Sequence, residues 1–322
     1  MYDYTYIRSI HLETTEICQA ICPMCARNDV DDGNLTAQIT LEQFKKWVPI
    51  DFIKKLEMLS MCGTLGDPIM AKDCYEIFEY IRKHNNTVIL ELHTNGSART
   101  EQWWRKLASQ HVRVIFGIDG LKDTHHLYRV NTNWSKIISN AKAFIEAGGH
   151  ATWDMIVFLH NQHQIDDCYQ LSLDLGFKEF HPFHTDRFGD RKNFKVWDKN
   201  KKFTHVIEPS TVPIKFYKKN DGLVTDQVDE FVSIDCKVLK ERAIYISANG
   251  NLAPCCWLAV HWRKPTDHWK LDYISKGFNL PNLNEMSLQE IFNSGFFNSI
   301  EQTWTTESKC LAICKNVCGA GK

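Results

Sequence analysis

Most of the 12 cysteines in this 322-residue chain lie in three groups. Thiols gathered in this way, in a chain without the basic and apolar segments of a secretory signal at its N-terminus, indicate metal binding or catalysis rather than disulfides. The isolated Cys62, Cys74 and Cys168 are expected to be small buried side chains. The three groups are Cys18, Cys22 and Cys25; Cys236, Cys255 and Cys256; and Cys310, Cys314 and Cys318.

The first group has the spacing C-x3-C-x2-C in residues 18–25. Three thiolates so close in sequence can hold three corners of an iron–sulfur cube and leave the fourth iron without a protein ligand from this segment. An open iron can bind a cofactor or substrate directly, as the open position of a catalytic zinc does. Zinc is the alternative, but structural zinc takes four ligands, commonly in separated pairs, so the spacing favours an iron–sulfur cluster.

The other two groups predict a second metal centre. Cys236 precedes Gly250 and Cys255 in the spacing C-x13-G-x4-C. Cys256 directly follows Cys255, which makes joint ligation of one cube awkward, and the remaining thiols suffice for one four-iron cluster. We expect Cys236, Cys255 and two thiols of the third group as ligands, and the sequence does not select that pair. A structural zinc in the same place is the alternative.

Alternating strands and helices position the first group. Apolar, β-branched-rich runs predict strands, and the segments between them have helical length and spacing. Thr40 and Gln43 predict a capping box, Asp73 is expected to cap the next helix, and Gly148 and Gly149 end the fourth. The strands are predicted at residues 7–13, 56–61, 88–93, 112–118, 152–160 and 177–183, and the helices at 41–48, 74–83, 101–110, 135–147 and 165–175.

Six β/α units in series predict a parallel sheet, either doubly wound or curled into a barrel, with the chemistry at the carboxyl ends of the strands. The alternation of predicted strands and helices is no longer recognisable between residues 188 and 235. We therefore predict a core domain at 1–189, a linker at 190–234 and a second domain at 235–322. The second domain, with a strand at 243–247 and a helix at 288–293 behind Ser287, looks small and held by metal.

Composition sets limits on the partners. Hydrophobic residues make up 43% and charged residues 24% of the chain, which excludes disordered and fibrous classes. The 38 Lys and Arg residues nearly balance the 39 Asp and Glu residues, so charge gives no case for nucleic acid or an anionic membrane as the main partner. Apolar runs fall far short of the about 18 residues that a membrane span needs. We expect a soluble, cytoplasmic protein.

The segment Leu12-Glu13-Thr14-Thr15, continued by Cys18, Cys22-Pro-Met and Cys25, resembles the cluster loop of the radical SAM superfamily. The resemblance implies a [4Fe–4S] cluster whose open iron is chelated by S-adenosylmethionine. It also implies that Met24, which stands where the family usually has an aromatic residue, lies near the adenine.

Three further elements resemble family motifs at predicted strand ends. Gly66-Asp67-Pro68 is similar to the Gly-Gly-Glu-Pro element that binds the methionine amino group, which implies an ionised Asp67. Thr94-Asn95-Gly96 resembles a turn beside the cofactor, and Gly117-Ile118-Asp119-Gly120 resembles Ser-Ile-Asp-Gly, with Arg129 as a possible carboxylate ligand. The resemblance covers about residues 7–185. It implies cofactor-binding roles for Met24, Gly66, Asp67, Pro68, Thr94, Asn95, Asp119 and Arg129.

The C-terminal cysteines are similar to the SPASM-type auxiliary domain, which uses seven cysteines, and with six they look like its shorter twitch form. Twitch radical SAM proteins common in bacteriophage genomes are also similar. The resemblance implies a partial (β/α)6 TIM-like barrel with a small twitch domain. That domain would bind one auxiliary [4Fe–4S] cluster, for electron transfer or, with an open iron, for substrate ligation.

The function implied by the resemblance is a radical SAM enzyme of the oxidoreductase or maturase type. Reductive cleavage of S-adenosylmethionine would yield a 5′-deoxyadenosyl radical that abstracts hydrogen from a peptide or protein, with flavodoxin or ferredoxin as electron donor. The alternatives are a dehydrogenase or cyclase acting on a small metabolite, and a non-catalytic iron–sulfur or zinc protein. No catalytic residue is assigned, although His181, His184 and Asp186 near the sixth strand could act as acid or base.

Overall fold

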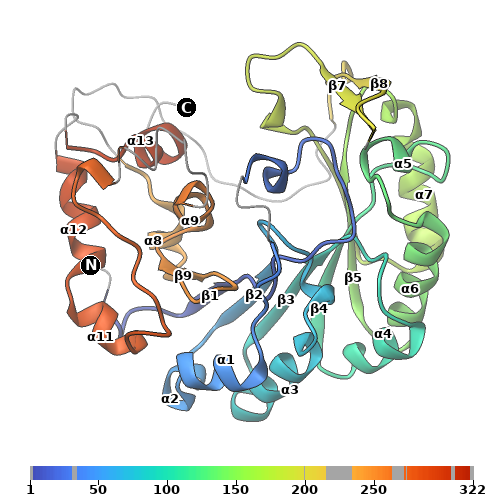
Figure 1. Cartoon of the computed structure of the whole chain (residues 1–322). Coiled ribbons are helices and arrows are strands. Elements are labelled where there is room, and N and C mark those ends of the chain that lie inside the picture. Colours follow the sequence, from blue (N-terminus) through green and yellow to red (C-terminus); the bar gives the residue numbers. More distant parts are fainter. Residues whose placement is uncertain are drawn as a thin grey trace.

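One open sheet organises the computed structural model, which describes residues 3–30, 35–198, 200–214, 234–262, 272, 274–305 and 309–319. The sheet has eight strands in the order β10-β9-β1-β2-β3-β4-β5-β6. Each strand from β1 to β6 pairs in parallel with the next, as predicted, and the result is the open sheet of a partial barrel (Figure 1). These strands are Ser9–Leu12, Met58–Cys62, Ile89–Thr94, Val112–Gly117, His150–Ile156 and Glu179–Phe183.

Helices cover the outer face of this sheet (Figure 1). Successive side chains of a strand point to opposite faces, so Leu12, Met61, Leu92 and Phe116 all reach the core between sheet and helices, where they are fully buried. The helices of this part are α1 Leu41–Trp47, α2 Ile50–Ile53, α3 Cys74–His84, α4 Glu101–Ala108, α5 His125–Tyr128, α6 Trp134–Glu146 and α7 Ile165–Leu175.

The helix signals are confirmed with one correction. Thr40 and Gln43 form the predicted capping box at α1, and Gly148 follows the end of α6 with a φ of +87°. Asp73 precedes α3 but its side chain does not cap that helix. Its carboxylate accepts a hydrogen bond from the Leu41 N–H at 2.9 Å instead, because the start of α1 packs beside it. Asp73 therefore ties two helix starts together.

The other face of the sheet carries polar side chains at the alternate positions. Glu91 accepts a hydrogen bond from Ser60 at 3.3 Å and lies 2.7 Å from the His93 ring. Two strands away, Asp154 lies 3.1 Å from the His181 ring. A closed barrel would fill this face with apolar side chains, so its polarity marks a surface that is available for binding.

The C-terminal segment continues the same sheet beyond β1. Strand β9 (Ala243–Ile246) pairs in parallel with β1, and β10 (Leu252–Ala253) pairs antiparallel with β9. The helices α8, α9, α11, α12 and α13 lie together at this end of the molecule, away from α5 to α7 (Figure 1). They span Lys237–Lys240, Cys256–Trp262, Leu288–Asn293, Phe296–Gln302 and Ala312–Cys318.

A β-hairpin lies inside the stretch for which the sequence predicted only a linker. It consists of β7 (Phe194–Trp197) and β8 (Phe203–Ile207). The inward side chains Phe194, Val196 and Ile207 pack in one apolar cluster with the loop that carries Cys22. The pattern was missed because both strands are short and the polar residues Lys195, Thr204 and His205 interrupt their apolar side chains. Within the predicted linker, residue 199 and residues 215–233 lie outside the described residues.

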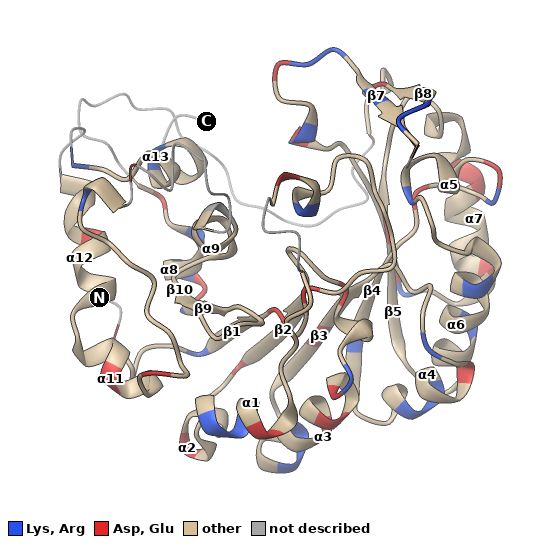
Figure 2. Cartoon of the chain, in the orientation of Figure 1, with Lys and Arg blue, Asp and Glu red and all other residues tan. Residues whose placement is uncertain are grey.

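Charged side chains of both signs alternate over the outer helices (Figure 2). This distribution agrees with the near balance of 38 basic and 39 acidic residues in the chain. No helix in the described part of the chain combines the length and the apolar character needed to cross a bilayer.

Candidate functional site

The three clustered thiols lie in one loop after the carboxyl end of β1. The loop is fixed by hydrogen bonds within it: the Cys25 N–H donates to the Cys22 carbonyl at 3.1 Å, and the Asn28 side-chain amide donates to the same carbonyl at 3.0 Å. The Ile21 N–H donates to the Val130 carbonyl at 2.9 Å, which attaches the loop to the segment after α5. All three cysteines are free thiols.

The electrostatic surroundings of these thiols suit a cationic partner. Burial raises the pKa of Cys18 to about 12, and the negative charge of Asp67 adds to the shift. Burial also raises the pKa of Cys22, while the positive charge of Arg129 lowers it in part. A buried thiolate without a partner is costly, so the ionised form of this donor set requires bound iron or zinc. The three thiols therefore fit the metal that the sequence predicts.

The Gly-Asp-Pro and Thr-Asn-Gly elements meet beside this loop. Both carboxylate oxygens of Asp67 accept from the Thr94 hydroxyl, at 2.8 and 3.0 Å, and one accepts from the Asn95 N–H at 2.8 Å. Burial raises the pKa of Asp67, and these hydrogen bonds lower it in part. Asp67 thus orients the turn after β3, a role that the sequence did not predict, and Pro68 begins the short 3₁₀ helix Pro68–Met70 that follows.

Gly66 is required by a close backbone approach. A Cβ at this position would lie 2.0 Å from the Thr15 carbonyl oxygen, which is closer than real atoms come. The Asp67 N–H donates to the Ile17 carbonyl at 2.9 Å at the same crossing. The glycine therefore lets the loop after β2 run directly against the cysteine loop, and a larger residue would separate them.

An unpaired acceptor points to a missing polar group at this junction. The Gln19 amide donates to the Asn95 side-chain oxygen at 2.6 Å, and the Asn95 amide approaches the Cys18 sulfur at 3.8 Å. The side-chain oxygen of Gln19 is buried and has no hydrogen-bond donor in the described part of the chain. Such orphaned acceptors are rare in folded proteins, so the junction fits a ligand that brings N–H or O–H groups. Sequence reasoning gave Gln19 no role.

Asp119 and Arg129 form a buried ion pair behind the loop. The Arg129 Nε donates to the Asp119 carboxylate at 2.6 Å, and the other oxygen of Asp119 accepts from the Ile156 N–H at 2.7 Å. The Asp119 charge strongly raises the pKa of Arg129 despite its burial. Because Nε is committed to Asp119, the guanidinium acts first as a fixed positive charge beside Cys22, and a carboxylate ligand could meet only its remaining N–H groups.

The remaining predicted residues divide between the site and its surroundings. Met24 is buried in the apolar cluster with Cys22, Tyr128 and Phe158, so it provides an apolar surface under the loop. His181 faces Asp154 on the polar face of the sheet. His184 instead contacts the Val212 carbonyl at 3.2 Å. His181 is therefore the candidate acid or base that shares a surface with other titratable groups.

The C-terminal thiols converge on Cys314. Burial raises the pKa of Cys314 to about 12, with contributions from Cys310, Cys236 and Cys318. Burial also raises the pKa of Cys255, with contributions from the adjacent Cys256 and from Cys314 and Cys236. The Asp235 N–H donates to the Cys318 carbonyl at 2.8 Å, which brings the start of α8 to the end of α13. Three chain segments therefore place buried or half-buried thiols together, as a cluster site needs.

The surroundings of the Cys256 thiol include a buried carboxylate, Glu13. Burial raises its pKa to about 11, and the next contribution comes from Glu13. Glu13 is buried and accepts from the Tyr245 hydroxyl at 2.5 Å and the Leu65 N–H at 2.5 Å. This unpredicted pair joins the end of β1 to β9. The only sequence signal for it is a carboxylate at the end of an apolar strand.

Two geometric observations limit the choice of site. No group of three or more Cys, His, Asp or Glu side chains within the described ranges is arranged to hold a single metal ion, so the cluster assignment rests on the donor chemistry.

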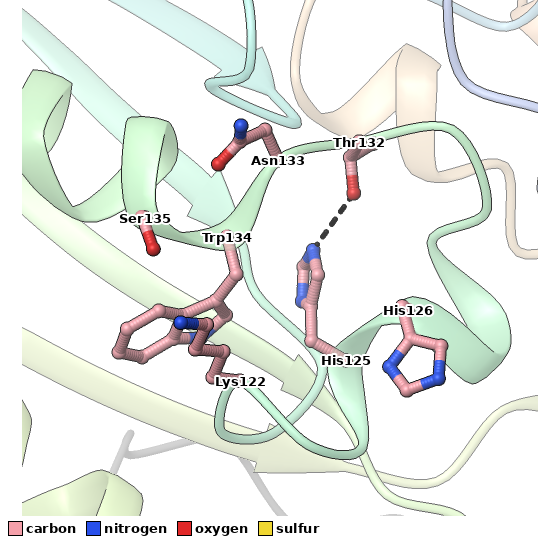
Figure 3. A pocket seen from close by; sticks show the side chains of 7 residues that line it. All are labelled: Lys122, His125, His126, Thr132, Asn133, Trp134 and Ser135. Carbon is pink, nitrogen blue, oxygen red and sulfur yellow. Dashed lines mark hydrogen bonds between the residues drawn. The ribbon is translucent and has the colours of Figure 1, made fainter.

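A pocket of about 250 Å³ lies behind the loop after β4, where Lys122, His125 and Trp134 line it (Figure 3). The His125 ring accepts a hydrogen bond from the Asp119 N–H and contacts Thr132. His125, which lines this pocket, therefore supports Asp119 from outside the site.

Comparisons with known protein families agree with this arrangement. The model of the radical SAM superfamily matches residues 12–171, and the model of an iron–sulfur cluster-binding domain, SPASM, matches residues 236–319.

Two curated proteins show distant similarity. A cysteine-type anaerobic sulfatase-maturating enzyme of Clostridium novyi is 22% identical, over 80% of this chain and 72% of that protein. The antilisterial bacteriocin subtilosin biosynthesis protein AlbA of Bacillus subtilis is 24% identical, over 90% of this chain and 60% of that protein. The chain thus spans less than two thirds of the length of AlbA.

Solved structures share the fold. Streptococcus suis SuiB bound to S-adenosylmethionine superposes with a TM-score of 0.62 at 14% identity, covering 98% of this chain and 72% of that one. BtrN in complex with AdoMet and 2-DOIA superposes with a TM-score of 0.50 at 12% identity, covering 96% of this chain and 92% of that one.

Proposed function

Because the chain belongs to the radical SAM superfamily and carries a SPASM-type iron–sulfur domain, we propose that it modifies a peptide or protein by hydrogen abstraction. The observation that supports the reaction class most directly is the meeting of three free thiols with the Asp67–Thr94–Asn95 contact and the unpaired Gln19 oxygen at one edge of the sheet. These parts come from the carboxyl ends of three neighbouring strands, β1, β2 and β3.

In this proposal Cys18, Cys22 and Cys25 hold a [4Fe–4S] cluster, and S-adenosylmethionine binds at its open iron. When bound, these groups supply a reductively generated 5′-deoxyadenosyl radical, with an electron from a low-potential donor such as flavodoxin or ferredoxin. The residues of the protein would orient the bound groups and shield them from water. Asp67 fixes the Thr94–Asn95 turn, Arg129 places positive charge beside Cys22, and the hairpin β7–β8 excludes water from the loop.

The auxiliary centre is proposed at Cys236, Cys255 and Cys314, with a fourth thiol from Cys310 or Cys318. Cys318 lies one helical turn after Cys314 in α13, and Cys310 lies two residues before that helix begins, so each is close to Cys314 along the chain. With four protein thiols, the auxiliary cluster has no open iron, and we assign it to electron transfer rather than to substrate ligation.

The proposed domain division is a core at 1–189, a linker at 190–234 and an auxiliary domain at 235–322. Part of the linker does more than connect the two domains, because β7 and β8 pack on the cysteine loop of the core. The Tyr245–Glu13 hydrogen bond likewise joins the auxiliary domain to the core. We propose that the two domains hold the substrate between them.

A peptide or protein is proposed as substrate because the similar proteins include a sulfatase-maturating enzyme and a bacteriocin biosynthesis protein. A small polar metabolite is the second candidate. The polar face formed by Glu91, His93, Asp154 and His181 favours it, since such groups could bind hydroxyl or amino groups. A structure of similar fold was solved with the small molecule 2-DOIA.

Anaerobic reconstitution with iron and sulfide, followed by dithionite and S-adenosylmethionine, tests the reaction class. We expect 5′-deoxyadenosine from the wild type and from Cys255→Ala, and none from Cys22→Ala. A wild type that binds iron but forms no 5′-deoxyadenosine, with or without peptide, would support the non-catalytic carrier instead. Two cubes predict about eight irons per chain, whereas about four irons and one zinc would reject the auxiliary cluster.

A further inference from the structure

Trp304 has a buried donor without an acceptor. It lies in the 3₁₀ turn Thr303–Thr305 after α12, and its ring packs against the small apolar core that also contains Cys255 and Cys314. The indole N–H is inaccessible to solvent, and no described residue accepts a hydrogen bond from it. Buried indole N–H groups normally find a partner, because losing their hydration without one is costly. The observation therefore calls for a stronger acceptor than any that the described residues place at hydrogen-bonding geometry to this N–H.

Cys314 is one of the cysteines that pack with the Trp304 ring against this small core. The indole is near enough to the Cys314 sulfur to lower the pKa of this thiol, against the larger effect of burial. A neutral thiol is a weak acceptor, and a thiolate is a strong one. Cys314 is also the thiol on which the other C-terminal cysteines converge, so it would ligate iron as the thiolate. Assembly of the cluster would then give the indole N–H the acceptor that it lacks.

We propose that the Trp304 indole N–H donates a hydrogen bond to the Cys314 sulfur of the auxiliary cluster and so raises the reduction potential of that cluster. The inference rests on the proposed function only in requiring an auxiliary cluster. Its physical basis is that reduction adds negative charge to the cluster sulfurs, and a donor directed at one of them stabilises the reduced form more than the oxidised form. Trp304 would thus make the auxiliary cluster a readier electron acceptor.

The matched pair Trp304→Phe and Trp257→Phe tests this inference. Trp257 lies next to Cys256 but is 51% exposed, so its replacement removes an indole near the same cysteines without removing a buried donor. The full-length proteins are reconstituted, and the auxiliary cluster is titrated by EPR at controlled potentials, in parallel with Cys22→Ala to separate the signal of the first cluster. We expect a more negative potential in Trp304→Phe and an unchanged potential in Trp257→Phe.

A second measurement does not depend on any variant folding. Wild type labelled with ¹⁵N in the indole ring should show a ¹⁵N coupling to the reduced auxiliary cluster in pulsed EPR. Absence of that coupling, or equal potentials in Trp304→Phe and wild type, would overturn the hydrogen bond. The iron content distinguishes a failure of the Trp304 hydrogen bond from the absence of the auxiliary cluster. About eight irons with unchanged potential rejects only the role of Trp304, whereas about four irons rejects the auxiliary cluster as well.

Discussion

The Arg129 guanidinium occupies the space that a side chain at Gly117 would need. A Cβ on Gly117 would lie 2.7 Å from the Arg129 Nη2 and 3.2 Å from its Cζ. The arginine cannot move away freely, because its Nε is bonded to the buried Asp119 carboxylate. The family element that this segment resembles has a serine where this chain has Gly117. In this structure the Arg129 guanidinium fills the place of that side chain with a positive charge.

Gly117→Ala should therefore destabilise the protein by about 1–3 kcal/mol, the usual range for overpacking a filled interior. The measurement is the free energy of unfolding of the apo protein in urea. The control is the same substitution in an Arg129→Ala background, where the space is empty and the added cost of the methyl group should largely vanish. An equal cost in both backgrounds would mean that the two residues do not compete for this space.

Asp67→Asn should weaken S-adenosylmethionine binding by about tenfold to a hundredfold, because charge-assisted hydrogen bonds from Thr94 and Asn95 become neutral ones and the turn after β3 loses its orientation. Equilibrium dialysis on the reconstituted, unreduced protein measures the dissociation constant. Asp73→Asn is the matched control, since Asp73 joins two helix starts outside the site. Iron content should stay at the wild-type value in both variants, and a loss of iron in Asp67→Asn would assign Asp67 to the cluster instead.

Cys314→Ala and Cys256→Ala should separate the auxiliary ligands from their neighbour. Cys314 is surrounded by other thiols, whereas Cys256 faces Glu13 and Cys62. We expect Cys314→Ala to lose about four irons per chain and Cys256→Ala to keep them. Iron and sulfide analysis provides the measurement. Loss of iron in Cys256→Ala alone would place this cysteine in the cluster and remove Cys314 from it.

Stability should fall in acid partly because of His125. Burial lowers the pKa of His125 to about 3 from its usual 6.5. A depressed pKa means that the neutral ring contributes stability that is complete above about pH 6.5 and is lost as the pH falls toward 3. One such group accounts for about 1.4 kcal/mol per pH unit inside this window.

His125→Gln removes this titration and should flatten the dependence of the unfolding free energy on pH between 6.5 and 4. Urea titrations of the apo protein at several pH values give the comparison. His84→Gln, in the last turn of α3 and outside the site, should reproduce the wild-type slope. Parallel curves for wild type and His125→Gln would show that this histidine titrates normally.

Local sequence patterns predicted much of the framework. Apolar runs and their spacing predicted the six parallel strands and the helices between them, and Thr40 with Gln43 predicted a cap that exists. Strand ends were displaced by a few residues. The hairpin β7–β8 was missed because its strands are short, polar residues interrupt their apolar side chains, and these side chains pack against a distant loop. Periodicity reports which residues are buried, but it does not report what buries them.

The cysteine spacing by itself determined that this chain has a three-thiol loop and a separate thiol-rich C-terminal segment, since ligands that close in sequence must lie close in space. Tertiary structure alone decided the rest. It directed Asp67 to Thr94, filled the place of a serine with Arg129, set Cys256 apart from Cys314 and left the Trp304 N–H without an acceptor. These relationships join residues from separate strands and loops, and their distances depend on how the whole sheet packs rather than on any local pattern.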